Sequence, residues 1–125
     1  MKAKVLVVDD SGLARRITRK ILEELEFEVE DVGDGAQALE AYVLHRHDVV
    51  ILDLLMHGMY GGDVLQKLRE LNPDLPVIIA TADIQRTTRE AVKEAGAVAM
   101  VNKPVSKEEL QQVLKVVLAG GTVWN

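Results

Sequence analysis

The sequence predicts an α/β protein in which a parallel β-sheet lies between two layers of helices. Short apolar runs alternate with stretches of helical periodicity, and this unit occurs five times in the 125 residues. The run at residues 49–52 is apolar at every position, which is typical of a strand buried on both faces of a parallel sheet. Right-handed crossovers then place helices on both faces of that sheet.

Five segments are predicted as strands. The segment at 27–32 alternates polar and apolar residues, which indicates a strand with one exposed face near an edge of the sheet. Pro76 opens the fourth segment, where a residue without an N–H is tolerated. The predicted strands cover residues 5–8, 27–32, 49–53, 77–80 and 97–101.

Five helices are predicted to follow these strands. Ser11 is a suitable N-cap for the first, which runs to Glu26. Gly96 occupies the usual position after the end of a helix, and Ser106 with Glu109 forms a capping pattern at the start of the last one. The other predicted helices cover residues 36–45, 61–71, 85–95 and 106–119.

The first and fourth helices differ in the strength of their apolar faces. In the fourth, the apolar stripe is thin and consists of Ile84, Ala91, Val92 and Ala95. In the first, apolar residues recur at helical spacing and are predicted to face the core, with basic residues on the solvated face. The apolar set is Leu13, Ile17, Ile21, Leu22 and Leu25, and the basic set is Arg15, Arg16, Arg19 and Lys20.

Length and composition limit the possible functions. The length predicts one domain at residues 1–121, followed by a tail at 122–125. The net charge is −5 with scattered basic residues, which argues against nucleic acid as a partner. The absence of cysteine excludes disulfides and thiolate metal sites. No signal peptide or membrane-length apolar run is visible, so a cytoplasmic protein without a membrane partner is expected.

Reactive side chains follow four of the predicted strands. Asp9 and Asp10 follow the first, Asp53 ends the third, Thr81 ends the fourth and Lys103 follows the fifth. If these strands are parallel neighbours, the side chains meet at one edge, where an open α/β sheet usually forms its ligand site. Two adjacent carboxylates are costly at such a place unless a cation neutralises them.

This set of groups suits the transfer of a phosphoryl group to a carboxylate beside a hard divalent cation. Asp9 and Asp10 would hold Mg²⁺, which prefers oxygen ligands, and the cation would shield Asp53 from an incoming anionic phosphoryl group. Lys103 would bind the phosphoryl oxygens, and the Thr81 hydroxyl would donate a hydrogen bond to one of them. Ala82 is small enough to leave space for that group to enter.

Five short motifs resemble the response-regulator receiver domain, the CheY-like family, in the same order and over essentially the full chain. They are Val-Asp-Asp-Ser at 8–11, Asp-Leu-Leu-Met at 53–56 with Gly61 downstream, Thr81-Ala82, Gly96-Ala97 and Asn102-Lys103-Pro104. The resemblance implies a flavodoxin-like, doubly wound (βα)₅ fold, with a five-stranded parallel sheet of order 2-1-3-4-5.

The resemblance also implies roles for individual residues. Asp53 is similar to the residue that accepts phosphate from a histidine kinase. Asp10, Asp53 and the backbone carbonyl of Leu55 resemble the direct Mg²⁺ ligands, with Asp9 acting through water. Thr81 and Lys103 resemble the switch hydroxyl and the phosphate-binding lysine, and Lys103-Pro104 resembles the family's cis peptide.

Three residues depart from the family pattern. His57 stands where the family usually has proline, and Tyr60 stands where it often has aspartate. Met100 occupies the position of the aromatic residue that usually couples to the switch hydroxyl. Methionine is flexible enough to repack, so a modified switch is expected. Leu55 and Asp83 should flank the path of the hydrolytic water, and an apolar Leu55 predicts slow loss of the phosphoryl group.

The expected function is that of a single-domain response regulator of a two-component system, either chemotaxis-type or in a phosphorelay. Its partners would be a histidine kinase or phosphotransfer protein, docking near Arg15, Arg16 and Arg19, and a downstream output protein. The helix at 85–95 is the expected movable element. The protein would be a monomer or a phosphorylation-linked dimer. The alternatives are a non-phosphorylated receiver-like scaffold and, less favoured, a Mg²⁺-dependent phosphatase.

The remaining residues of interest carry weaker expectations. His45, His47 and His57 lack a metal-binding spacing and are predicted at the surface. Trp124, the only tryptophan, is expected to dock on the last helix or to lie free, with a role in dimerisation as a further alternative.

Overall fold

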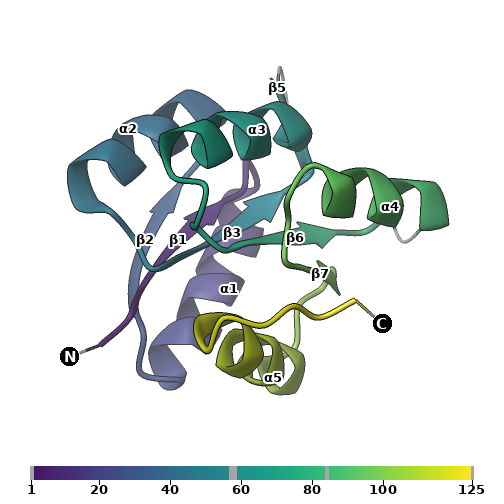
Figure 1. Cartoon of the computed structure of the whole chain (residues 1–125). Coiled ribbons are helices and arrows are strands. Elements are labelled where there is room, and N and C mark those ends of the chain that lie inside the picture. The colour runs from purple at the N-terminus through teal and green to yellow at the C-terminus, as the bar shows by residue number, and fades with distance from the viewer. Residues whose placement is uncertain (1, 57–58, 84, 125) are drawn as a thin grey trace.

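The computed structural model describes residues 2–56, 59–83 and 85–124. A five-stranded parallel sheet has the order β2-β1-β3-β6-β7 and confirms the predicted fold class and strand order. Helices α1 and α5 cover one face of the sheet, and α2, α3 and α4 cover the other (Figure 1). The strands of the sheet are β1 (Lys4–Val8), β2 (Glu28–Val32), β3 (Val49–Asp53), β6 (Val77–Thr81) and β7 (Ala99–Asn102).

The helices match the predicted segments to within a few residues. Side chains of Ser11, Asp34 and Ser106 accept hydrogen bonds from backbone N–H groups in the first turns of α1, α2 and α5, which stabilises those ends. The helices are α1 (Gly12–Glu24), α2 (Gly35–His45), α3 (Gly61–Leu71), α4 (Arg86–Glu94) and α5 (Lys107–Leu118).

A short antiparallel pair, β4 (Leu55–Met56) and β5 (Met59–Tyr60), follows β3 where the sequence indicated only a loop. Gly61 then starts α3 directly against the end of β3, and its N–H donates to the Leu54 carbonyl at 2.7 Å. A Cβ at position 61 would clash with the Asp53 carbonyl and lie 2.8 Å from the Leu54 Cα. Glycine is therefore required for this approach, which holds the chain around Asp53 in place.

Two apolar clusters fill the space between sheet and helices. The first lies under α2, α3 and α4 and contains Tyr42, Leu65 and Val92. The second lies under α1 and α5 and contains Leu22, Leu110 and Leu114. Both faces of β3 and β6 are buried, which confirms the interpretation of their continuous apolar runs.

The predicted orientation of α1 is wrong in its first half. Leu13 and Ile17 are 63% and 46% exposed, whereas Thr18 and Leu22 are buried. At 3.6 residues per turn, Leu13 and Ile17 lie roughly 180° and 140° around the helix from Leu22, but Arg15 lies only about 20° from it. Arg15 therefore turns toward the sheet, and two apolar side chains are left on the surface.

Helix α4 is held to the sheet by few apolar side chains. Val92 is buried, but Ala91 and Ala95, which were predicted to share its stripe, are exposed. Ile84 lies outside the described residues. The thin buried face is the feature on which the expectation of a movable helix depends, and that expectation stays a prediction.

The tail at 122–124 packs beside β7 and α4. The Val123 N–H donates to the Val98 carbonyl at 2.9 Å, and Val123 bridges Ala99 in the parallel sense. Trp124 packs against the first cluster, with the Lys93 ammonium of α4 5.7 Å from its ring. The expectation that it docks on α5 or lies free is therefore wrong. Within the described part of the chain, no helix is long and apolar enough to cross a membrane.

Candidate functional site

The carboxyl ends of β1, β3, β6 and β7 bring the predicted site residues to one edge of the sheet. Asp53 and Thr81 are the last residues of β3 and β6, and Asp9 and Lys103 directly follow β1 and β7. The Lys103 N–H donates to the Thr81 carbonyl at 3.0 Å, so the end of β7 is fixed beside β6. The Lys103–Pro104 peptide bond is cis.

Three carboxylates gather at this edge. Asp9, Asp10 and Asp53 each offer an oxygen within 4.8 Å of the others. Asp9 and Asp53 are buried, at 5% and 6% exposure. Buried like charges at this separation repel one another and are poorly solvated, which a positive charge relieves. The all-oxygen donor set fits Mg²⁺, which binds one or two carboxylates and keeps several waters.

Lys103 supplies one positive charge to the cluster. Its ammonium donates to Asp9 Oδ2 at 2.7 Å and lies 3.5 Å from Asp53 Oδ2. Desolvation by burial lowers the pKa of Lys103, but the Asp9 hydrogen bond and the Asp53 and Asp9 charges outweigh it, so this pKa is raised. The lysine is therefore held as a cation between two acids.

Asp53 lies in an environment that opposes its ionisation. Desolvation by burial and the negative charge of Asp9 raise its pKa, and Lys103 and the Leu55 N–H offset this only in part. That N–H lies 3.4 Å from Asp53 Oδ1. Because the nearby positive charge does not fully balance these carboxylates, Asp53 attracts a cation. Once a cation is bound, Asp53 repels an incoming anion less strongly.

Thr81 connects this edge to the start of α4. Its buried hydroxyl accepts a hydrogen bond from the Asp83 N–H at 3.0 Å. The Asp83 carboxylate accepts from the Gln85 N–H at 3.0 Å and from the Thr88 hydroxyl at 2.7 Å. The Thr88 and Gln85 hydrogen bonds lower the pKa of Asp83. Ala82 is exposed, so the space beside Thr81 is open.

The remaining predicted residues surround this edge. Met100 is paired with Ile79 in the sheet and packs, partly buried, against the first cluster. Leu55 is 63% exposed in β4. Tyr60 directly precedes α3 and is also exposed. The prediction for His57 lies outside the described residues.

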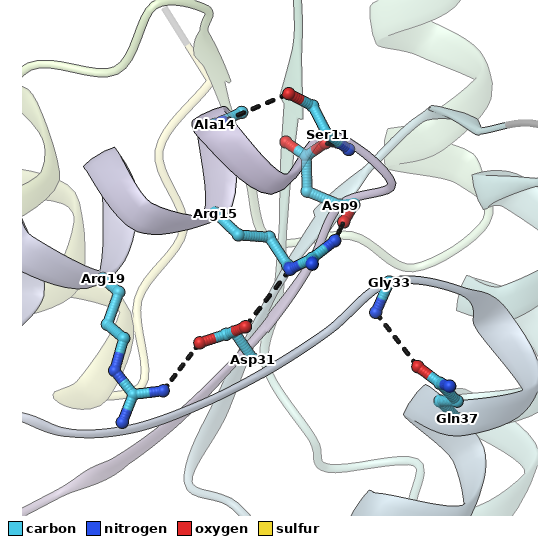
Figure 2. A network of polar contacts seen from close by, with 8 residues as sticks. All are labelled: Asp9, Ser11, Ala14, Arg15, Arg19, Asp31, Gly33 and Gln37. Carbon is cyan, nitrogen blue, oxygen red and sulfur yellow. Dashed lines mark hydrogen bonds and ion pairs between the residues drawn. The ribbon is translucent and has the colours of Figure 1, made fainter.

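A network of arginines supports Asp9 and is missed by the helical pattern of the sequence. Figure 2 shows Arg15 between the chain at Asp9 and Asp31 of β2. Arg15 Nη1 donates to the Asp9 carbonyl at 2.6 Å and its Nε to Asp31 Oδ1 at 3.2 Å. Arg19 Nη1 donates to Asp31 Oδ2 at 2.6 Å. Asp9 Oδ1 accepts from the Ser11 N–H at 2.9 Å, so Asp9 is held by its backbone and its side chain.

The predicted surface position is correct for His45, which is exposed, but wrong for His47. His47 is buried, and both rings contact the Glu30 carboxylate. The sequence pattern could not reveal this, because Glu30 lies 15 and 17 positions earlier, on β2.

The fold and the acidic strand ends define a doubly wound α/β protein with its site at the carboxyl edge of the sheet. Residues 5–115 match the model of the response regulator receiver domain. The chain belongs to this family of signalling proteins, the receiver domains of two-component systems.

Two mycobacterial relatives are similar along most of the chain. It is 40% identical over 114 residues to the probable transcriptional regulatory protein TcrX of Mycobacterium tuberculosis. The matched residues cover 91% of this chain and 49% of that protein. It is 35% identical over 118 residues to the response regulator MprA of Mycobacterium sp., and the matched residues cover 94% of this chain and 51% of that protein. The chain thus spans about half the length of these relatives.

Solved structures support the same family. The chemotaxis protein CheY4 of Vibrio cholerae has a TM-score of 0.88 at 31% identity, over 92% of this chain and 98% of that one. A CheY-like receiver domain protein of Methanospirillum hungatei has a TM-score of 0.89 at 26% identity, over 95% of both chains.

Proposed function

We propose that this domain accepts a phosphoryl group on Asp53 from the phosphohistidine of a histidine kinase or phosphotransfer protein. The observation that carries the proposal is the placement of Asp53 beside Asp9 and the Lys103 ammonium, at 3.5 Å from the latter. A carboxylate oxygen attacks phosphorus, the bond from phosphorus to the histidine nitrogen breaks, and its electron pair stays on that nitrogen.

The acidic cluster would hold Mg²⁺ through Asp10, Asp53 and the backbone carbonyl of Leu55, with Asp9 acting through water. When bound, the cation supplies charge that stabilises the transferring phosphoryl group. Lys103 would bind a phosphoryl oxygen, as a point charge already placed at this edge. The Thr81 hydroxyl would donate to another oxygen, in the open space beside Ala82.

The output would pass through α4. The Thr81 hydroxyl now accepts from the Asp83 N–H, and Asp83 holds the first turn of α4 through Gln85 and Thr88. If Thr81 turns toward the phosphoryl group, that chain of hydrogen bonds changes and α4, with its thin buried face, can shift. Met100 would repack where an aromatic residue usually moves. A downstream partner that binds this face would then distinguish the two states.

The docking surface for the phosphate donor would lie on α1, beside the acceptor edge. Leu13 and Ile17 are exposed there, and a hollow of about 330 Å³ runs from Ile17 to Lys103, Pro104 and Val105. Arg16 is exposed on the same helix and could meet an acidic partner. Arg15 and Arg19, in contrast, are engaged with Asp31.

The direct test is the intact mass of the protein after incubation with acetyl phosphate and Mg²⁺. The expected result is the gain of one phosphoryl group, absent in Asp53→Ala and in a sample with EDTA. A folded protein that gains no mass would instead support the scaffold interpretation. Light scattering on the same phosphorylated sample would report whether phosphorylation converts a monomer to a dimer.

A further inference from the structure

Glu30 of β2 lies between two imidazoles near the amino ends of β1 and β3, away from the acidic edge. Glu30 Oε1 is 2.9 Å from His45 Nδ1 and 2.7 Å from His47 Nε2. One oxygen and two ring nitrogens, all within 4.8 Å of one another, thus converge from β2 and from the stretch of chain where α2 ends. This is a donor set of the His₂Glu type.

The end of α2 makes this convergence possible. Residues two apart on a helix do not share a face, so His45 and His47 could not meet one carboxylate if the helix continued. Instead α2 ends at His45, and Arg46 adopts a left-handed conformation with φ 47°. A residue other than glycine adopts this conformation at some cost. The resulting reversal brings His47 back toward β2.

The two rings differ in exposure, which suits a site that is partly preformed. The His47 side chain is 2% exposed and stacks on Tyr42 with ring centroids 6.3 Å apart. Among the described residues, its Nδ1 has no hydrogen-bond partner, so Nε2 makes the ring's polar contact to Glu30. The His45 side chain is 53% exposed and has room to adjust.

A hollow of about 240 Å³ opens beside the three groups and is also lined by Lys4, Glu28 and Val29. It leaves room for a water molecule, which needs about 30 Å³ of liquid volume. A three-residue set with one accessible position is the arrangement that binds zinc with water as its fourth ligand.

We propose that Glu30, His45 and His47 bind Zn²⁺. Imidazole nitrogen and carboxylate oxygen suit this ion, whose tetrahedral bonds of about 2.0–2.1 Å separate neighbouring ligand atoms by about 3.3 Å. The Glu30–histidine separations therefore open by roughly half an ångström on binding, which the exposed His45 allows. Each ring binds through the nitrogen that now faces Glu30. Binding displaces the proton that this nitrogen shares with the carboxylate, and the neutral ring then carries its single proton on the other nitrogen.

The bound ion would join the end of α2 to β2 and to the segment before β3. Because it would bind the folded protein and not the unfolded chain, it would raise the melting temperature with increasing Zn²⁺ concentration. This site does not depend on the proposed phosphoryl chemistry, since it shares no residue with the acidic edge.

Isothermal titration with Zn²⁺ in excess Mg²⁺ tests the proposal. The expected result is one Zn²⁺ per chain and a higher melting temperature, with affinity reduced at least about tenfold in His45→Ala and in Glu30→Gln, on the scale of disturbed metal sites. His45 is exposed and Glu30→Gln nearly conserves shape, so both variants should fold. Their melting temperatures without Zn²⁺ verify this.

Two controls separate this site from other sources of binding. His57→Ala removes the remaining histidine of the chain and should leave the affinity unchanged. Asp53→Ala disables the acidic edge and should also leave it unchanged. The proposal is overturned if the parent protein binds no Zn²⁺, if binding survives in both His45→Ala and Glu30→Gln, or if it disappears in Asp53→Ala.

Discussion

Lys103 and Asp9, which lie 94 residues apart in the sequence, form an ion pair of 2.7 Å at the carboxyl edge of the sheet. Asp53 Oδ2 lies 3.5 Å from the same ammonium. One lysine thus balances two buried carboxylates, so the same group that would bind a phosphoryl oxygen also stabilises the fold before any phosphoryl group arrives.

Replacement of Lys103 by alanine should therefore lower the free energy of unfolding by about 1–3 kcal/mol, the usual cost of leaving a charged partner without its hydrogen bond. Added Mg²⁺ should restore part of the loss, because the cation would neutralise the same carboxylates. Urea unfolding with and without Mg²⁺ measures both effects. Lys103→Arg keeps the charge, so its free energy of unfolding should fall less than that of Lys103→Ala. Equal stability of Lys103→Ala and the parent would show that Lys103 does not stabilise the fold.

Arg15 should act on Mg²⁺ affinity without being a ligand. Its guanidinium holds the Asp9 carbonyl at 2.6 Å and is itself fixed by Asp31. Removing it in Arg15→Ala should weaken Mg²⁺ binding roughly tenfold. This is the lower end of the loss in metal affinity that follows when a residue that orients a ligand is removed. Titration of Mg²⁺ by calorimetry gives the affinity.

The matched control for this experiment is Arg16→Ala. Arg16 is the next residue on α1 but is exposed, so its loss should change the Mg²⁺ affinity little. If both variants weaken binding equally, the effect comes from net charge and not from the hold on Asp9.

Asp83 should stabilise α4 in a pH-dependent way. Because its pKa is lowered in the folded protein, its ionised form stabilises the fold above the unfolded pKa, and this contribution is lost as the pH falls through the folded pKa. Asp83→Asn should therefore melt at a lower temperature than the parent at neutral pH, and the difference should close in acid.

Melting curves over a pH series, with hydrogen exchange of the α4 amides, measure this dependence. Thr88→Val removes the hydrogen bond from the Thr88 hydroxyl to Asp83. In a Thr88→Val background, Asp83→Asn should therefore lower the melting temperature by less than it does in the parent protein. A difference that stays constant down to acidic pH would show that the carboxylate charge is not involved.

Leu55 should set the lifetime of the acyl phosphate. Its exposed side chain cannot orient water, whereas asparagine at this position could donate or accept a hydrogen bond. A new hydrogen bond of about 1 kcal/mol in the transition state corresponds to roughly fivefold faster hydrolysis. The decay of the phosphorylated mass in Leu55→Asn and in the parent provides the comparison.

Leu71→Asn is a suitable control for that measurement, because Leu71 is an exposed leucine at the end of α3. Its decay rate should match that of the parent. An unchanged lifetime in Leu55→Asn would remove Leu55 from the path of the hydrolytic water.

The sequence by itself determined the five strands of the parallel sheet, the bounds of α3 and the meeting of Asp9, Asp53, Thr81 and Lys103 at one edge. These follow from local signals: a continuous apolar run specifies a buried strand, and parallel strands share the direction of their carboxyl ends. The strand order that makes these four ends neighbours came from the resemblance to the receiver family.

Only the tertiary structure decided which way each helix turned and what met across the chain. The apolar spacing in α1 predicted that Leu13 and Ile17 face the core, but the helix exposes them, and Arg15 and Arg19 pair with Asp31. His47 is buried because Arg46 reverses the chain toward Glu30. Such contacts join residues that are distant in sequence, so no local period encodes them.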